Sequence, residues 1–240
     1  KTYTEELAGL GIGTESRDLS DSAYQAAGKL LLDAIGCAAA GYSQPGIHEI
    51  IEQMCEWGGK AESSILFSDI KVPAPQAAFA NSCMIHAFDY DDIDMPGILH
   101  ISSVVVPAVL ACAEMKDASG KDALAALTMG VEIAGRISIA ERFRRRGVAF
   151  LPTSLAGGFG AVIAAARLFG LDREQTVNAM GINYAQISGN RQALFDMTLT
   201  KRMQPGFAVR SALWAVGLAQ KGLTGPVNVF DGKARSEERR

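Results

Sequence analysis

The sequence predicts an all-α fold of about eight to ten helices, with the chemistry carried by loops. Apolar residues recur three to four positions apart through much of the chain, for example in residues 30–38 and 124–137. Capping and helix-breaking residues separate these runs, and no segment alternates like a half-buried strand. A length of 240 residues can bury a sizeable core, so we expect a helical domain over residues 1–232 and a polar tail over residues 233–240.

Residues that start or stop helices divide the first half of the chain. Gly11 and Gly13 should end a short first helix, whereas Ser20 or Asp21 caps a long one that Gly41 closes. Proline starts each of the next two helices, because its fixed φ suits the first helical turn. The segments expected here are helices over residues 4–10, 21–41, 45–57 and 73–88, and a loop over residues 61–72 that is extended near 64–67.

The second half follows the same logic. Ser102 and Ser103 can cap the next apolar run, Asp172 caps a later one, and Pro205 opens the last amphipathic helix. A polar linker should occupy the stretch before Pro205. The helices expected here cover residues 104–115, 121–143, 154–170, 173–186 and 205–222.

Composition and charge exclude several classes of function. The chain is 48% hydrophobic and 20% charged, as in globular soluble proteins, and a net charge of −3 gives no field for nucleic acid or an anionic membrane. Residues 147–166 carry no charge and are long enough to cross a bilayer, but Pro152 and three glycines favour a buried helix. The N-terminus has no apolar signal core, so we expect a cytoplasmic protein.

The four cysteines lie in apolar, helix-like contexts, and no two of them form a CxxC pair. We therefore expect buried free thiols in a reducing compartment and no cysteine-based zinc or redox site. The cysteines are Cys37, Cys55, Cys83 and Cys112.

The stretch over residues 86–103 carries the densest group of titratable side chains, with four carboxylates and two imidazoles within fifteen positions. Buried carboxylates are costly unless they are paired, and imidazoles move protons near neutral pH. We expect Asp89 or Asp94 to cap a flanking helix, and His86 to be a structural histidine. If the protein is an enzyme, this stretch is its predicted centre.

Three kinds of site use residues like those of this stretch. A calcium loop starting at Asp89 fails, because Asp94 and His100 stand where glycine and glutamate are required. A magnesium–diphosphate site is disfavoured by the spacing of residues 91–94 and by the lack of a second acidic cluster. The remaining interpretation is acid–base chemistry on an anionic substrate, with His100 moving a proton and an aspartate tuning it.

Two further features concern anions and nucleotides. Cations in the linker over residues 190–205 precede a predicted helix start, where free N–H groups favour carboxylates, although an exposed basic loop explains them equally well. The arginine run over residues 142–146 should end a helix in water. Residues 157–160 lack the strand and spacing of a dinucleotide fingerprint, so close helix packing is expected there and no nucleotide cofactor.

These stretches together resemble the MmgE/PrpD family of 2-methylcitrate dehydratases, cis-aconitate decarboxylase and iminodisuccinate epimerase. The resemblance runs from residue 31 to residue 226 and is most specific over residues 86–92, 100–107, 160–171, 200–206 and 218–226. It implies a large helical domain that is usually followed by a smaller α/β domain, with the active site between them and no cofactor.

The resemblance also implies the site residues. The catalytic aspartate, histidine and lysine of the family fall on Asp89, His100 and Lys201. Their shared chemistry removes a proton α to a carboxylate, after which water or CO₂ is lost or the proton returns. The residues expected to bind substrate are Asp92, Ser102, Arg191 and Arg202, and we expect no metal ion.

Three positions depart from the family pattern. Ile93 replaces a frequent threonine, and Leu151 and Gln204 replace frequent histidines. An epimerase tolerates such losses better than a dehydratase, because it expels no hydroxide. No α/β pattern is present, so we expect a fragment or a truncated family member.

We therefore expect a cofactor-independent enzyme, or its helical domain, that abstracts a proton α to a carboxylate of a small di- or tricarboxylate. A 2-methylcitrate dehydratase-like lyase is the first choice, and an iminodisuccinate epimerase-like enzyme or a decarboxylase are the alternatives. A non-catalytic helical dimerisation scaffold is the alternative from another class. The apolar helix content favours a homodimer, with no nucleic-acid or membrane partner.

Overall fold

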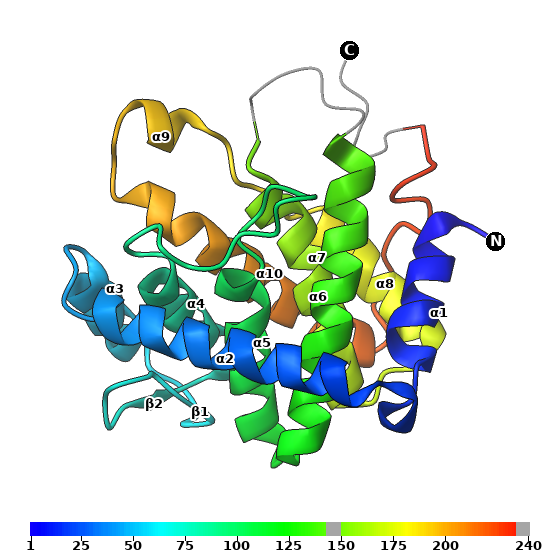
Figure 1. Cartoon of the computed structure of the whole chain (residues 1–240), viewed down its shortest axis with the longest axis horizontal. Coiled ribbons are helices and arrows are strands. Elements are labelled where there is room, and N and C mark those ends of the chain that lie inside the picture. The colour runs from blue at the N-terminus through cyan, green and yellow to red at the C-terminus, as the bar shows by residue number, and fades with distance from the viewer. Residues whose placement is uncertain (143–149, 234–240) are drawn as a thin grey trace.

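The computed structural model describes residues 1–142 and 150–233 and confirms the all-α class (Figure 1). The arginine run over residues 142–146 lies outside the described residues except for the helical end at Arg142, and so does the tail after residue 233. The helices are α1 (Tyr3–Gly13), α2 (Asp21–Gly41), α3 (Ile47–Trp57), α4 (Ala74–Ile85), α5 (Ser102–Lys116), α6 (Gly120–Arg142), α7 (Pro152–Phe169), α8 (Arg173–Tyr184), α9 (Gln192–Phe195) and α10 (Thr200–Gln220).

Several predicted helix ends are confirmed by their caps. The Ser20 hydroxyl accepts a hydrogen bond from the Ala23 N–H at 3.2 Å and starts α2. Asp172 and Gln175 form a reciprocal capping box at the start of α8. Gly58 follows the last residue of α3 with a positive φ, which glycine adopts without strain.

Several helices begin or end elsewhere than predicted. Helix α3 begins at Ile47 and not at Pro45, and α4 ends at Ile85 and not at residue 88. The ends of α1 and α10 differ as well. The first helix continues through Gly11, because the absent side chain lets α1 approach α7: a Cβ there would lie 2.6 Å from Ile163 Cγ2. The last helix begins at Thr200 and contains Pro205, so Lys201 lies in its first turn and not in a preceding loop. A proline so near a helix start removes only one backbone hydrogen bond.

The predicted loop between α3 and α4 contains a short antiparallel hairpin, and the predicted linker before α10 contains the single turn of α9. The hairpin pairs β1 (Ser63–Ser64) with β2 (Lys71–Val72). Each strand is only two residues long, which is too short to produce the alternation that identifies a strand in a sequence.

Helix α7 forms the centre of the core and packs against α5, α6, α8 and α10 (Figure 1). Its apolar face is buried, and the predicted close packing of its glycines is confirmed. A Cβ on Gly160 would lie 2.5 Å from the carbonyl oxygen of Gly130 on α6. By length and composition α6 and α7 could each cross a membrane, but buried core helices pass the same test.

Three of the four cysteines are buried, as predicted, and all four are free thiols. The prediction is wrong for Cys55, whose side chain is exposed on α3. It occupies the position after Met54, which is buried, so it faces away from the core.

Candidate active site

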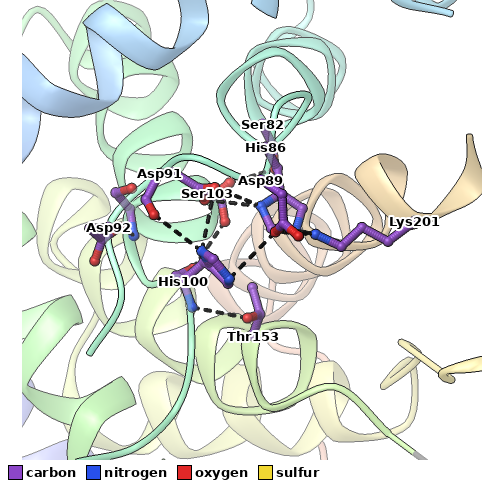
Figure 2. A network of polar contacts seen from close by, with 10 residues as sticks. Ser82, His86, Asp89, Asp91, Asp92, His100, Ser103, Thr153 and Lys201 are labelled. Carbon is purple, nitrogen blue, oxygen red and sulfur yellow. Dashed lines mark hydrogen bonds and ion pairs between the residues drawn. The ribbon is translucent and has the colours of Figure 1, made fainter. Parts of the chain in front are cut away.

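Three segments that are distant in sequence meet around a cluster of polar side chains (Figure 2). His86 is the C-cap of α4, the loop over residues 87–101 carries the acidic residues and His100, and Lys201 comes from the first turn of α10. Helices α4 and α10 pack against each other, which brings residues separated by more than 100 positions into contact.

Lys201 is the cation of the cluster. Its ammonium donates a hydrogen bond to Asp89 Oδ1 and another to His86 Nε2, the latter at 2.8 Å. The Asp89 side chain is about half exposed, whereas that of His86 is buried. The ion pair therefore has one face toward solvent, where an anionic ligand can reach it.

Asp91 is the central acceptor of the cluster, and its carboxylate is inaccessible to solvent. Both of its oxygens lie 3.0 Å from His86 Nδ1, and Oδ1 lies 3.4 Å from His100 Nδ1. The network thus assigns a proton to Nδ1 of each imidazole, and Nε2 of His86 accepts from Lys201. The two rings meet edge to face at 4.9 Å.

His100 is held from its backbone as well as from its ring. Its N–H donates to Thr153 Oγ1 at 3.0 Å, at the start of α7, and its carbonyl accepts from the Ser103 hydroxyl at 2.9 Å. The ring Nδ1 also lies 3.3 Å from the Asp91 carbonyl. His100 Nε2 lies 3.6 Å from Oδ1 of the half-exposed Asp89 and is directed toward that carboxylate (Figure 2).

The loop is shaped by residues with positive φ and by a carboxylate cap. Asp89 adopts φ 56°, a conformation that aspartate tolerates better than most residues. The expectation that Asp89 or Asp94 caps a helix is wrong. Asp94 instead accepts from the Gly97 N–H within the loop, and Asp92 Oδ1 accepts from the Ser102 N–H at 2.9 Å at the start of α5.

The prediction that Ser102 or Ser103 caps α5 is also wrong. Ser102 is the first residue of the helix, and its side chain makes no capping hydrogen bond. Asp92 supplies the acceptor from ten residues earlier in the chain. A carboxylate at a helix N-terminus is favoured by the helix dipole as well as by the hydrogen bond.

The electrostatics of the cluster follow from burial and from these contacts. Burial alone would raise the pKa of Asp91, but hydrogen bonds from His100 and His86 outweigh it and hold that pKa well below its usual value. Partial burial opposes ionisation of Asp89 too, yet Lys201 lowers its pKa. Burial opposes protonation of His100, but Asp91 and then Asp89 raise its pKa above 6.5. Both carboxylates are therefore charged at neutral pH, and His100 is a strengthened base.

The structure brings together the three residues that the resemblance assigned to catalysis, Asp89, His100 and Lys201 (Figure 2). In the prediction Asp89 tunes His100, whereas in the structure Asp91 makes the closer contacts with the imidazole and Asp89 pairs mainly with Lys201. Burial raises the pKa of Asp92, the residue that caps α5.

The residues predicted to bind substrate are dispersed. Ser102 is fully buried, so its hydroxyl does not reach the exposed side of the cluster. Arg191 is the N-cap of α9, and its guanidinium makes no hydrogen bond or ion pair within the described part of the chain. Arg202 follows Lys201 on α10 but points elsewhere, donating to the Pro45 carbonyl at 2.7 Å and lining a cavity of about 420 Å³.

Sequence reasoning missed three members of the cluster. His86 was expected to be structural, and it is buried, but it also holds Lys201. The sequence does not distinguish Asp91 from its acidic neighbours, and it carries no signal that places Thr153 in the cluster. Only the spacing of His86 and Asp91, which lie five residues apart around a helix end, could have indicated that they pair.

The cluster also has the composition of a metal site, although we expected no metal ion from the sequence. One possible ligand atom from each of His86, Asp89, Asp91 and His100 lies within 4.8 Å of the others. The Lys201 ammonium, however, already occupies the hydrogen-bonding positions between Asp89 and His86. In this arrangement a cationic side chain stands where an ion could bind.

Comparison with known proteins identifies the family. The sequence profile of the MmgE/PrpD N-terminal domain matches residues 5–236, which is nearly the whole chain. The chain belongs to the MmgE/PrpD family. The predicted resemblance is therefore confirmed, and the match to the family's N-terminal domain agrees with the all-helical fold.

Named relatives within the MmgE/PrpD family include three cis-aconitate decarboxylases or similar proteins. The chain is 30% identical to the cis-aconitate decarboxylase-like protein oryM of Aspergillus oryzae, over 95% of this chain and 49% of that protein. It is 29% identical to cis-aconitate decarboxylase of Homo sapiens and 27% identical to that of Mus musculus, over 96% of this chain in each case. The chain spans about half the length of these relatives.

Proposed function

We propose that this chain is the helical part of a cofactor-independent lyase that transfers a proton at the carbon α to a carboxylate of a small di- or tricarboxylate. The observation that carries the proposal is the state of His100. Its Nδ1 is held by Asp91, and its Nε2 lies 3.6 Å from the Asp89 that pairs with Lys201. A base oriented by a carboxylate, beside a fixed cation, is suited to forming and protonating an enolate.

Each residue has a distinct role in this mechanism. His100 Nε2 accepts or returns the proton, and Asp91 stabilises the imidazolium that forms. The Lys201 ammonium lies beside the same space and stabilises negative charge that develops on the substrate carboxylate. Asp89 holds Lys201 in position, and Arg191 remains our candidate for binding a second carboxylate, because its guanidinium is unpaired in the described part of the chain.

Decarboxylation is the lyase reaction that we favour, because the relatives are named as cis-aconitate decarboxylases. Loss of CO₂ from an unsaturated tricarboxylate leaves its electron pair on the substrate as an enolate-like carbanion. Protonation by the His100 imidazolium then completes the reaction, and the neutral imidazole takes up a proton from water before the next turnover, so atoms and charge balance without a cofactor. Like epimerisation, this route needs no acid to expel hydroxide, which fits a site where Leu151 and Gln204 replace histidines.

The test uses the intact natural protein with a panel of di- and tricarboxylates in D₂O, followed by NMR. We expect deuterium at a carbon α to a carboxylate, together with CO₂ release for the true substrate. The His100→Gln variant should lower the rate by at least about 100-fold. The exposed His48 provides the matched control, so His48→Gln should react at the parent rate. A His100→Gln variant as fast as the parent would refute the proposed role.

The same measurement separates the alternatives. Deuterium incorporation without net product indicates an epimerase, and an unsaturated acid formed with loss of water indicates a dehydratase. A non-catalytic helical scaffold would neither exchange deuterium nor bind any polycarboxylate in calorimetry. We further propose a homodimer in the cytoplasm, which sedimentation and cell fractionation test directly.

A further inference from the structure

We propose that the cluster of His86, His100 and Asp89 is a binding site for a divalent transition-metal ion such as Zn²⁺, and that the ion inhibits the protein by displacing Lys201. The ligands would be Nε2 of each imidazole and Oδ1 of Asp89. Metal binding stands on the geometry of the cluster alone. Inhibition rests in addition on the proposed function, which requires Lys201 and a free His100 Nε2.

The distances suit a small ion with nitrogen and oxygen ligands. Asp89 Oδ1 lies 3.6 Å from His100 Nε2 and 3.9 Å from His86 Nε2. Zinc bonds of roughly 2.0–2.1 Å in a tetrahedral site place neighbouring ligand atoms about 3.3 Å apart. Asp89 Oδ1 needs to approach each imidazole nitrogen by only a few tenths of an ångström, and Asp89 lies on an exposed loop that can provide this movement.

The surroundings of the two imidazoles are those of metal ligands. Histidines that bind metals usually donate the other ring N–H to a carboxylate, which fixes the tautomer and strengthens the ligand. Asp91 accepts from Nδ1 of His86 at 3.0 Å and lies 3.4 Å from Nδ1 of His100, with its side chain inaccessible to solvent. One buried carboxylate therefore orients both Nε2 lone pairs toward the side of the cluster where Asp89 lies (Figure 2).

Lys201 competes with a metal ion for the proposed ligand atoms. Its ammonium bonds to two of the three proposed ligand atoms, Asp89 Oδ1 and His86 Nε2. A metal ion must therefore displace a positive charge from the same place. Because the lysine stem is flexible and partly exposed, the ammonium can move into water without unfolding α10.

The test is a titration of the intact protein with Co²⁺, whose visible absorption reports tetrahedral nitrogen and oxygen ligation without reference to activity. We expect weak binding to the parent and binding at least about tenfold tighter to Lys201→Met, which retains the length of the stem but lacks the charge. Zn²⁺ should displace the Co²⁺ from both proteins. Equal affinities for the parent and for Lys201→Met would overturn the proposal.

Further substitutions in the Lys201→Met background locate the ion. His100→Gln should abolish the absorption, Asp91→Asn should weaken binding by about 10–100-fold, and the exposed-residue control His48→Gln should leave it unchanged. Thermal melting with and without metal verifies that each variant is folded. An absorption band that survives His100→Gln would place the ion elsewhere and refute the site.

The metal site and the proposed function can be refuted separately. Tighter Co²⁺ binding to Lys201→Met with no deuterium exchange on any polycarboxylate would leave the metal site standing and refute the proposed function. If the parent protein exchanges deuterium but neither it nor Lys201→Met binds Co²⁺, the metal site is refuted and the proposed function stands. Zinc inhibition of exchange that disappears when a chelator is added is the result expected if both are correct.

Discussion

Asp91 is the residue on which the geometry of the cluster depends. A carboxylate without solvent contact is costly unless it is fully paired, and this one is paired with two imidazoles. It fixes the tautomer of both rings and thereby decides which nitrogen of His100 can act as a base. It does so without facing the exposed side of the cluster, so we regard it as a positioning residue.

The first prediction tests that role in the reaction. Asp91→Asn should lower kcat about 100-fold, because an amide can donate to Nδ1 and favour the wrong tautomer. Polycarboxylate affinity in calorimetry should change little, because Lys201 is retained. Asp117→Asn is the matched control, since Asp117 is exposed and its φ of 49° suits asparagine. A parallel loss of affinity and kcat would indicate general disruption instead of positioning.

At the level of elements, the site depends on how helix ends are brought together. The end of α4 supplies His86, the start of α10 supplies Lys201, and the start of α5 is capped by Asp92 from the loop between them. The relative positions of these ends are set by α7, which contacts both α5 and α10. Changes that separate the core helices should therefore affect the site as well as stability.

The second prediction concerns the contact between α6 and α7. Gly160→Ala should lower the free energy of unfolding by about 2 kcal/mol, because the new Cβ would meet the Gly130 carbonyl oxygen at 2.5 Å. Gly135→Ala is the opposite control in α6, since no atom lies within 4 Å of its added Cβ. It should stabilise the protein by roughly 0.5–1 kcal/mol. Denaturant unfolding measures the free energy of unfolding of both variants, and the two changes from the parent should have opposite signs.

The third prediction concerns the hairpin and acid. Glu114 on α5 accepts hydrogen bonds from Ser64 in β1 and pairs with Lys71 in β2 at 2.7 Å. Partial burial alone would raise the pKa of Glu114, but Lys71 and Ser64 lower it below the ordinary 4.5. A lowered carboxyl pKa stabilises the folded state above the ordinary pKa, and this contribution is lost as pH falls through the folded value.

The measurement is urea unfolding of the parent and of Glu114→Gln between pH 7 and pH 3. The parent should lose more stability than the variant as pH falls below about 4.5, by less than about 1 kcal/mol, since the pair is at the surface. Above that pH the difference in free energy of unfolding between the parent and the variant should be constant. Identical pH profiles would show that the ionised Glu114 does not stabilise the hairpin.

At the scale of the whole molecule, the segment after α10 returns to the first helix and closes the core. The Val229 N–H donates to the buried Thr4 hydroxyl at 3.3 Å, and the Phe230 ring packs 5.0 Å from that of Phe159 on α7. This segment has no regular secondary structure, but it packs against the central helix through Phe230. The segment after α10 therefore contacts both the first helix and the central helix.

The fourth prediction follows from that closure. Phe230→Ala should lower the free energy of unfolding by about 3 kcal/mol, because the ring is buried against Phe159. The matched control is Phe195→Ala on α9, where the ring is 68% exposed and the change should be under about 0.5 kcal/mol. Comparable losses for the two variants would contradict the closure of the core by this segment.

Local sequence was sufficient for most of the fold. Helix periodicity and caps act within a few turns, so Ser20, Asp172 and Gly58 could be assigned from their neighbours alone. Two of the errors at helix ends arose where a local signal was overridden. Gly11 remained helical because α7 approaches it, and Pro205 was accommodated one turn inside α10.

The sequence by itself determined that this is an all-α chain with an acidic, histidine-containing loop and a basic segment far downstream. Tertiary structure alone decided that Lys201 meets His86, 115 residues away, and that Asp91 and not Asp89 orients His100. The physical reason is range. Capping and periodicity are encoded within one helix. Contacts between side chains that are distant in sequence depend on how whole helices pack, and small residues along the helix faces decide how closely the helices approach.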